Sequence, residues 1–153
     1  MNRVDAARLD RLVRAARAHP RLRMNDNLHA MEDAIHRLLN ATEPGTYVQP
    51  HRHSAPPKVE TLAVLAGRGA IVLFDDAGAV LETSVLSPRG PDLVAEIPGG
   101  AWHTLLALEP GTVWLEIKAG PYAAPRPEEL AGFAPAPGTA AADAYLAALL
   151  ARV

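Results

Sequence analysis

The chain contains no cysteine among its 153 residues. This absence excludes disulfide bonds, thiolate metal sites and a cysteine nucleophile, so any metal ion must be bound by nitrogen and oxygen atoms. The sequence also lacks an uninterrupted apolar run of about 18 residues, which a membrane-spanning helix would need. No apolar stretch follows the basic residues at the N-terminus, as it would in a signal peptide. We therefore expect a single soluble, cytoplasmic domain that makes no contact with a membrane.

Neither sign of charge dominates the chain. It has 15 Lys and Arg residues against 17 Asp and Glu residues, without a long run of either sign. Binding to the phosphates of DNA or RNA requires concentrated positive charge, so we expect no nucleic-acid partner. The Gly67-Arg68-Gly69 turn is not followed by the Lys-Ser/Thr pair of a phosphate loop, and no serine lies in a nucleophile-elbow pattern.

Helical periodicity occurs near both ends of the sequence. Residues 4–18 place apolar side chains at helical spacing, and the pattern stops before Pro20. A second helical pattern runs to about Asn40 and consists of Leu28, Met31, Ile35, Leu38 and Leu39. A third predicts a short C-terminal helix, with Ala142, Tyr145, Leu146, Leu149 and Leu150 on one face.

In the middle of the chain, the pattern of apolar residues changes to a period of two residues. Short segments rich in Val, Leu and Ile are separated by turn residues, and they cover 46–50, 58–66, 70–75, 79–86, 92–97, 102–108 and 112–118. Such spacing, without helical patterns between the segments, favours an antiparallel sandwich or barrel. We therefore predict an all-β domain with a helical N-terminal extension (1–44), a β core (45–122) and a C-terminal wrap and helix (123–153).

Four side chains in this β core suggest a metal site. His51 and His53 end the first strand pattern, where residues i and i+2 point to the same face. Glu60 lies early in the next segment, and His103 begins another one behind the Pro98-Gly99-Gly100 turn. If the strands close into a barrel, these positions meet near one mouth. Three imidazoles and a carboxylate suit Zn, Fe(II), Mn, Ni or Co, and these ligand types do not select among the ions.

The same residues resemble the two motifs of the cupin family. The first motif, Gly-x5-His-x-His-x3or4-Glu-x6-Gly, corresponds here to Gly45, His51, His53, Glu60 and Gly67. The second is similar to Pro98-x-Gly100-x2-His103. The resemblance implies a double-stranded β-helix, or jelly-roll barrel, in which His51, His53, Glu60 and His103 bind one divalent metal ion. It also implies a homodimer, because cupins commonly pair through their sheet edges.

The sequence departs from the cupin pattern at three places. The interval from His53 to Glu60 is two residues longer than usual, so Lys58 stands where the shorter spacing would put the glutamate. We favour Glu60 because its distance to Gly67 fits the motif and because a carboxylate, unlike an ammonium group, can donate electron pairs to a metal. The other departures are Ala107 in place of asparagine and Asp92 in place of glycine.

Further segments are similar to the WbuC-type cupin-fold metalloproteins, which are encoded among bacterial O-antigen and surface-polysaccharide genes. They are Arg21-Leu22-Arg23, Asn27-Leu28-His29, 47–53, 58–60 and 116–122. The resemblance implies a metal-dependent enzyme that acts on a small, sugar-derived molecule in surface-polysaccharide metabolism. The alternatives are a non-catalytic, metal-dependent protein that binds or senses a small molecule, and a protein whose metal is chiefly structural.

A catalyst of this kind needs a proton donor or acceptor beside the metal. Besides the ligands, the candidates are Lys58, Tyr47, Tyr122 and His29. If all four pointed away from the metal, the enzyme hypothesis would lose its main support. His29, Asn27 and Lys118 are candidates for contacts to the substrate at the barrel opening.

Overall fold

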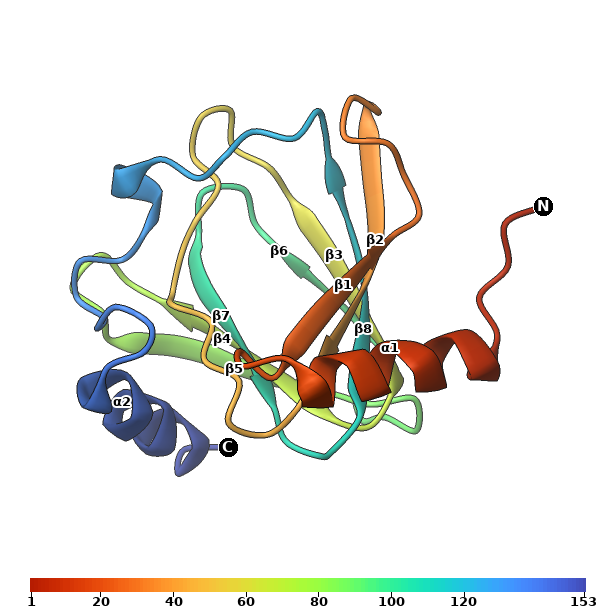
Figure 1. Cartoon of the computed structure of the whole chain (residues 1–153). Coiled ribbons are helices and arrows are strands. Elements are labelled where there is room, and N and C mark those ends of the chain that lie inside the picture. The colour runs from red at the N-terminus through yellow and green to blue at the C-terminus, as the bar shows by residue number, and fades with distance from the viewer.

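Two antiparallel β-sheets face each other in the computed structural model, which describes residues 1–153 (Figure 1). The strands are β1 (Arg23–Asn27), β2 (Ile35–Thr42), β3 (Glu60–Ala66), β4 (Gly69–Phe74), β5 (Val80–Leu86), β6 (Val94–Ile97), β7 (Trp102–Ala107) and β8 (Thr112–Ala119). The helices are α1 (Ala6–Ala18), a 3-10 turn (Pro127–Glu129) and α2 (Ala140–Leu150). The larger sheet has the order β1-β2-β8-β3-β6 and the smaller one β5-β4-β7. The mostly-β architecture expected from the sequence is confirmed.

The N-terminal helix forms as predicted. The Asp5 side chain caps α1 by accepting a hydrogen bond from the backbone N–H of Arg8, and the helix ends at Ala18, with His19 as its C-cap just before Pro20. Its buried residues Leu12 and Ala16 pack on the outer face of the larger sheet, against Leu39, Ala41 and Val113. The apolar stripe read from the sequence is therefore the face that covers this sheet.

The prediction of a second helix is wrong, because this region forms the turn after β1 and most of β2. β2 lies inside the larger sheet and pairs with β1 on one side and with β8 on the other. Met31 and Ile35, which suggested a helical stripe, are exposed at 46% and 57%. Pairing on both edges of β2 outweighs the local helical spacing, because tertiary contacts override intrinsic propensity. The N-terminal extension thus contributes strands to the barrel.

Six of the seven predicted strands are present within a few residues of the expected limits. The exception is 46–50, which is an extended segment outside any named strand. The Val48 carbonyl accepts a hydrogen bond from the Thr104 hydroxyl, and at His51 one backbone bridge joins the segment to His103 of β7 and another joins it to Leu130. The segment therefore runs beside β7 and closes that side of the barrel.

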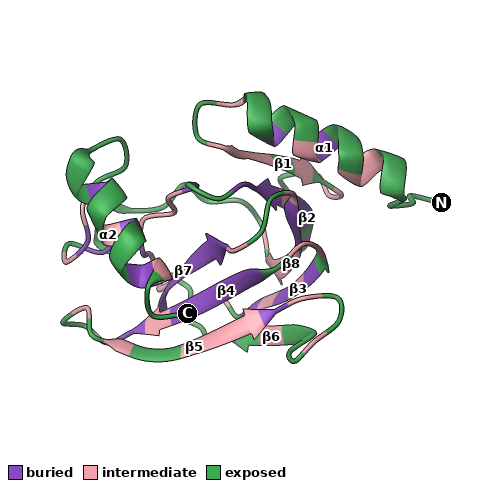
Figure 2. Ribbon diagram, turned by 90° about the horizontal axis from the view of Figure 1, so that it is seen from below, coloured by how far each residue is buried: buried purple, intermediate pink, exposed green.

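Apolar side chains fill one part of the space between the sheets and also cover the smaller sheet from outside. Between the sheets lie Leu62, Val64, Ile71, Leu86, Ile97, Leu105 and Trp114. On the outer face of the smaller sheet, Leu146 and Leu149 of the predicted C-terminal helix pack with Val72 and Leu106. Figure 2 shows α1 over the larger sheet and α2 beside the smaller one, with buried residues concentrated in the strands.

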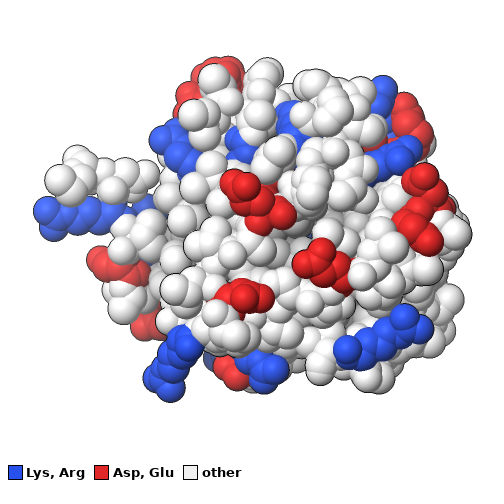
Figure 3. Space-filling view, turned by 180° about the vertical axis from the view of Figure 1, so that it is seen from behind, with Lys and Arg blue, Asp and Glu red and all other residues white.

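The surface carries charges of both signs. On the face shown in Figure 3, Lys and Arg residues are interspersed with Asp and Glu residues, which agrees with the formal net charge of −2. This face therefore offers no extended basic patch. In a separate respect, none of the helices is long and apolar enough to span a membrane.

Candidate metal centre

Three histidines and one glutamate that lie far apart in the sequence meet between the two sheets. The ring centroids of His51 and His103 are 4.3 Å apart, and those of His51 and His53 are 5.5 Å apart. Glu60 Oε1 lies 2.6 Å from His53 Nε2, and Glu60 Oε2 lies 3.3 Å from His103 Nε2. The structure thus brings together all four side chains that the motif spacing singled out.

Backbone pairing places His51 directly beside His103. The N–H of His51 donates to the His103 carbonyl at 2.9 Å, and the N–H of His103 donates to the His51 carbonyl at 2.9 Å. His103 is the second residue of β7 and shares the inner face with Leu105, whereas Trp102 faces outward. His53 follows His51 by two residues, so both rings leave the extended segment on the same side.

Hydrogen bonds to backbone carbonyls determine which nitrogen is protonated in two of the rings. His51 Nδ1 lies 3.1 Å from the Gln49 carbonyl, and His103 Nδ1 lies 2.9 Å from the Ala101 carbonyl. A carbonyl oxygen only accepts, so each Nδ1 carries a proton, and in a neutral ring the Nε2 lone pair is then free for a metal ion. Burial and the neighbouring His103 lower the pKa of His51 to about 3, which keeps its ring neutral. Neutral imidazoles held through Nδ1 are the metal-binding form.

His103 Nε2 is a buried nitrogen without a hydrogen-bond partner. Its neighbour at 3.3 Å, Glu60 Oε2, also only accepts, so the two lone pairs repel each other unless a cation or a proton lies between them. Leaving such a buried group unsatisfied costs about 1–3 kcal/mol. A metal ion between these atoms would satisfy both.

Lys118 joins this cluster directly. Its Nζ donates to Glu60 Oε1 at 2.7 Å and lies 2.6 Å from Glu116 Oε1. Burial alone would lower the pKa of Lys118, but the charges of Glu116 and Glu60 outweigh this effect and raise it. Burial alone would raise the pKa of Glu60, but its contacts with His103 and His53 and the charge of Lys118 lower it. Both groups are therefore ionised.

The cluster is closed around Glu60 rather than open around an ion. No set of three or more His, Asp or Glu side chains in the structure is arranged to hold a metal ion. Glu60 Oε1 is instead shared by His53 and Lys118. The donor atoms nevertheless fit a divalent transition metal, since three imidazoles and one carboxylate converge and one imidazole nitrogen is unpartnered.

Lys58 takes no part in the cluster. Its Nζ donates to the Pro121 carbonyl at 3.1 Å, outside the group of histidines. Glu60 begins β3, is 3% exposed, and shares the inward face of the strand with Leu62. The geometry thus favours the longer motif spacing, with Glu60 as the carboxylate, over the shorter spacing that would use Lys58.

The two tyrosine candidates also lie apart from the cluster. The Tyr47 hydroxyl donates to the Pro135 carbonyl at 2.8 Å, and burial raises the pKa of Tyr47 to about 12. Its ring packs edge-on against Tyr145 at a centroid distance of 6.4 Å. Tyr122 is 56% exposed. Neither phenol forms a hydrogen bond with a residue of the histidine cluster.

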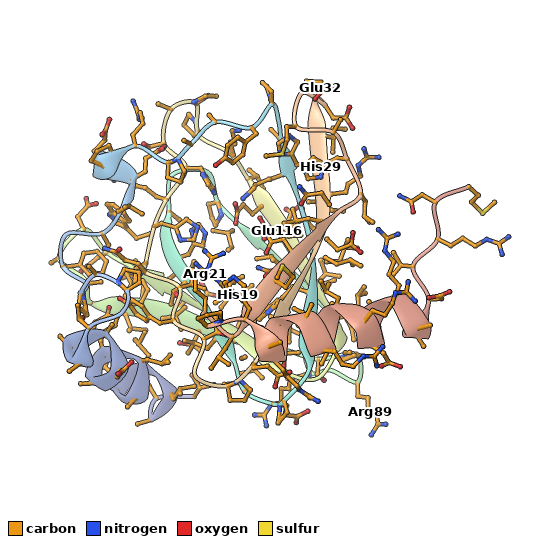
Figure 4. All side chains as sticks on the ribbon, in the orientation of Figure 1. His19, Arg21, His29, Glu32, Arg89 and Glu116 are labelled. Atoms are coloured by element: carbon orange, nitrogen blue, oxygen red, sulfur yellow. The ribbon has the colours of Figure 1, made fainter.

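The candidates near the β1–β2 turn contact each other and the backbone. His29 stacks on His36 with ring centroids 4.0 Å apart, and His29 Nδ1 lies 2.7 Å from the Arg37 carbonyl oxygen and 3.0 Å from the Arg37 backbone nitrogen. The Asn27 amide lies 3.8 Å from the Met31 sulfur. In Figure 4, His29 lies toward the upper end of the molecule, whereas Glu116 lies centrally between the sheets.

Sequence reasoning missed Glu116, which is 6% exposed and has Lys118 as its ion-pair partner. The signal was present in the alternation of β8. Trp114 faces the interior, so Glu116 and Lys118 must face it as well, whereas Val113 and Leu115 pack beneath α1. Two charged residues at inward positions of a central strand indicate a polar site.

The C-terminal wrap holds the histidine segment in place. The N–H of Arg52 donates to the Glu129 carbonyl at 3.0 Å, and the N–H of Ala131 donates to the Pro50 carbonyl at 2.9 Å. The Glu129 carboxylate accepts hydrogen bonds from the backbone N–H groups of Ser54 and Arg126, which lower its pKa to about 2. The irregular wrap thus has a defined role in positioning the segment.

Comparison with known proteins identifies a family model and a fold. Residues 4–86 match the family model described as "Domain of unknown function (DUF6016)", which covers more than half of the chain. No curated protein matches the sequence.

Three solved structures illustrate the fold. The protein TT1209 from Thermus thermophilus has a TM-score of 0.54 at 22% identity, over 78% of this chain and 97% of that chain. A cupin superfamily protein from Desulfitobacterium hafniense has a TM-score of 0.50 at 16% identity, over 63% of this chain and 76% of that chain. Oxalate oxidase in complex with the substrate analogue glycolate has a TM-score of 0.51 at 15% identity, over 66% of this chain and about half (52%) of that one. At these identities the likeness concerns the fold alone, and that fold is cupin-like.

Proposed function

The chain belongs to the DUF6016 family and has a cupin-like fold, and from this premise we propose that its barrel binds one divalent metal ion through His51, His53, Glu60 and His103. The observation that carries the proposal is the buried, unpartnered Nε2 of His103 facing a carboxylate oxygen of Glu60. Two imidazoles, each held by a carbonyl at Nδ1, support it.

Glu60 would exchange its contact with His53 for the ion, while Lys118 would keep its ion pair with Glu116. The donor set suits Zn, Fe(II), Ni or Mn. When bound, the ion would supply Lewis acidity toward an oxygen atom of the ligand.

We further propose that the protein is an enzyme and that Glu116 and Lys118 are its acid–base pair. Lys58, Tyr47 and His29 use their polar atoms elsewhere, and Tyr122 is exposed, so the four residues first considered do not support the enzyme hypothesis. Glu116 can accept a proton inside the barrel, and the Lys118 ammonium can donate a hydrogen bond to a substrate oxygen. A sugar-derived substrate in bacterial surface-polysaccharide metabolism is supported by the resemblance to WbuC-type proteins.

A non-catalytic, metal-dependent binding or sensing protein is the second candidate function. The tight pairing of Glu116 with Lys118, 2.6 Å apart, favours it, because both groups then serve to hold a ligand rather than to exchange protons with it. A Glu116→Gln variant that still binds ligand, even if more weakly, but has lost turnover at saturating ligand would support the enzyme.

The metal site is tested by elemental analysis of the protein purified without a metal-affinity tag. We expect close to one equivalent of a transition metal in the wild type and a loss of at least tenfold in a His51→Ala, His53→Ala double variant. Removing two of four ligands leaves too few donors for tight binding.

The matched control is a His19→Ala, His29→Ala double variant, which removes two imidazoles that lie away from the cluster. It should keep the wild-type metal content. Equal metal content in the wild type and in the His51, His53 double variant would overturn the proposed site.

A further inference from the structure

The inner face of the larger sheet carries a row of polar residues that leads away from the proposed metal site, on which this inference rests. Lys118 pairs with Glu60 across β8 and β3, and Glu116 lies two residues earlier on the same face. Glu116 pairs with Leu38 of β2, which makes Asn40 its diagonal neighbour on that face. The row therefore runs from β3 across β8 to β2.

Arg23 continues the row on β1. It lies opposite Thr42, which accepts a hydrogen bond from the indole of the interior residue Trp114. Arg23 therefore faces the interior and is the diagonal neighbour of Asn40. The next residue, Met24, packs on the other face beneath α1, as strand alternation requires.

These residues have binding capacity that the protein itself does not use. Arg23 is half-buried and forms no ion pair with an acidic side chain, and burial, together with the charge of Arg21, lowers its pKa. The Oδ1 atom of Asn40 is buried without a hydrogen-bond partner. Glu116 is paired only with Lys118. The row thus presents one cationic side chain without an acidic partner, Arg23, and two side chains, Asn40 and Glu116, that can accept further hydrogen bonds.

This pattern defines a ligand. A guanidinium group binds carboxylate or phosphate oxygens, often through two parallel hydrogen bonds. The acceptors on Asn40 and Glu116 would be satisfied by hydroxyl groups. Two diagonal steps separate Arg23 from Glu116, on the order of 15 Å between β-carbons, and the long arginine side chain spans part of this distance.

We infer that the barrel binds an acidic sugar, whose anionic group is held by Arg23 and whose hydroxyl groups are held by Asn40 and Glu116. The remaining end of the molecule faces the histidine cluster. The inference deepens the proposed function by naming the substrate class as an anionic polyol. The anionic group is either a carboxylate, as in a uronic acid, or a phosphate.

Isothermal titration calorimetry of the metal-loaded full chain tests this inference with three probes, D-glucuronate, D-glucose 6-phosphate and D-glucose. We expect at least one acidic sugar to bind at least tenfold more tightly than glucose, and the tighter of the two identifies the anion. Arg23→Gln should abolish the preference, and Arg23→Lys should retain part of it. Glu116→Gln should weaken binding of the preferred acidic sugar severalfold.

Arg89→Gln is the matched control, because Arg89 is exposed on a loop and projects from the lower rim of the molecule (Figure 4). It removes the same charge and should leave every affinity unchanged. Equal affinities for the three sugars, no binding of either acidic sugar, or an unchanged preference in Arg23→Gln would overturn the inference.

Metal content, measured on each variant, separates this inference from the proposed function. Arg23→Gln with full metal content and no preference for the acidic sugar supports the inference. A wild-type chain without metal would overturn the proposed function, and the same titrations on the metal-free chain would still decide whether Arg23 selects an acidic sugar.

Discussion

At the scale of single residues, Glu60 and Lys118 show how the charges in the site are balanced. A carboxylate that is 3% exposed and shared between His53 and Lys118 is ionised, although burial opposes its charge. The ammonium group of Lys118 compensates this charge in the structure as it stands. A divalent ion would add positive charge to the same place, which the second carboxylate, Glu116, helps to balance.

Glu60→Gln tests which carboxylate serves the site. An amide oxygen is a weaker metal ligand and carries no charge, so we expect the metal content to fall at least tenfold. Lys58→Met is the control, because the Lys58 ammonium group contacts only the Pro121 carbonyl. Elemental analysis of both variants checks the prediction. Loss of metal in Lys58→Met, with metal retained in Glu60→Gln, would contradict it.

At the scale of elements, the C-terminal wrap is held by hydrogen bonds to the histidine segment. Backbone bonds join residues 129–131 to 50–52, and the Glu129 carboxylate accepts from the N–H of Ser54 at 2.8 Å. An extended segment with one backbone bridge to β7 needs such support, because most of its groups are not paired in a sheet.

The stability that Glu129 contributes should depend on pH. Its pKa is lowered from 4.5 to about 2 in the folded chain, so the folded state favours the ionised form. The contribution is then fully present above about pH 4.5 and is lost as the pH falls toward about 2. Urea unfolding of the wild type and Glu129→Gln should show a difference in the free energy of unfolding that shrinks over this range. A difference that is constant with pH would contradict the prediction.

At the scale of the whole molecule, the outer faces of the two sheets are better protected than their edges. A helix covers the outer face of each sheet, α1 on the larger and α2 on the smaller. The edges are less protected, since β6 pairs only with β3, and its first residue Val94 and the preceding Leu93 are 56% and 57% exposed. An apolar free edge favours association with a second strand.

We expect a homodimer that forms through this edge. Val94→Lys places a charge on β6 and should shift the chain toward a monomer, because a lysine on an edge strand disfavours pairing. Sedimentation equilibrium measures the change, and Glu109→Lys, on the exposed turn before β8, is the control. A wild-type chain that is monomeric at every concentration would refute the expectation.

Prediction from the sequence succeeded where the signal was local. α1 follows from an apolar stripe with polar neighbours, α2 follows from the helical spacing of its large apolar side chains, and six strands follow from alternation between turn residues. The approach of His51 and His53 follows from the i, i+2 geometry of an extended chain. Prediction failed for β2. This segment is a strand because it pairs with β8, which lies far away in the sequence, as well as with β1, and local spacing does not reveal such pairing.

The amino-acid sequence by itself determined the type of fold and the set of side chains that could bind a metal, because alternation, turns and motif spacing are properties of neighbouring residues. Only the tertiary structure decided that Glu60 and not Lys58 joins the histidines, and that Glu116, Lys118 and Arg23 face the same interior. These outcomes depend on strand register and burial, which arise when distant segments pair and cannot be read from any one of them.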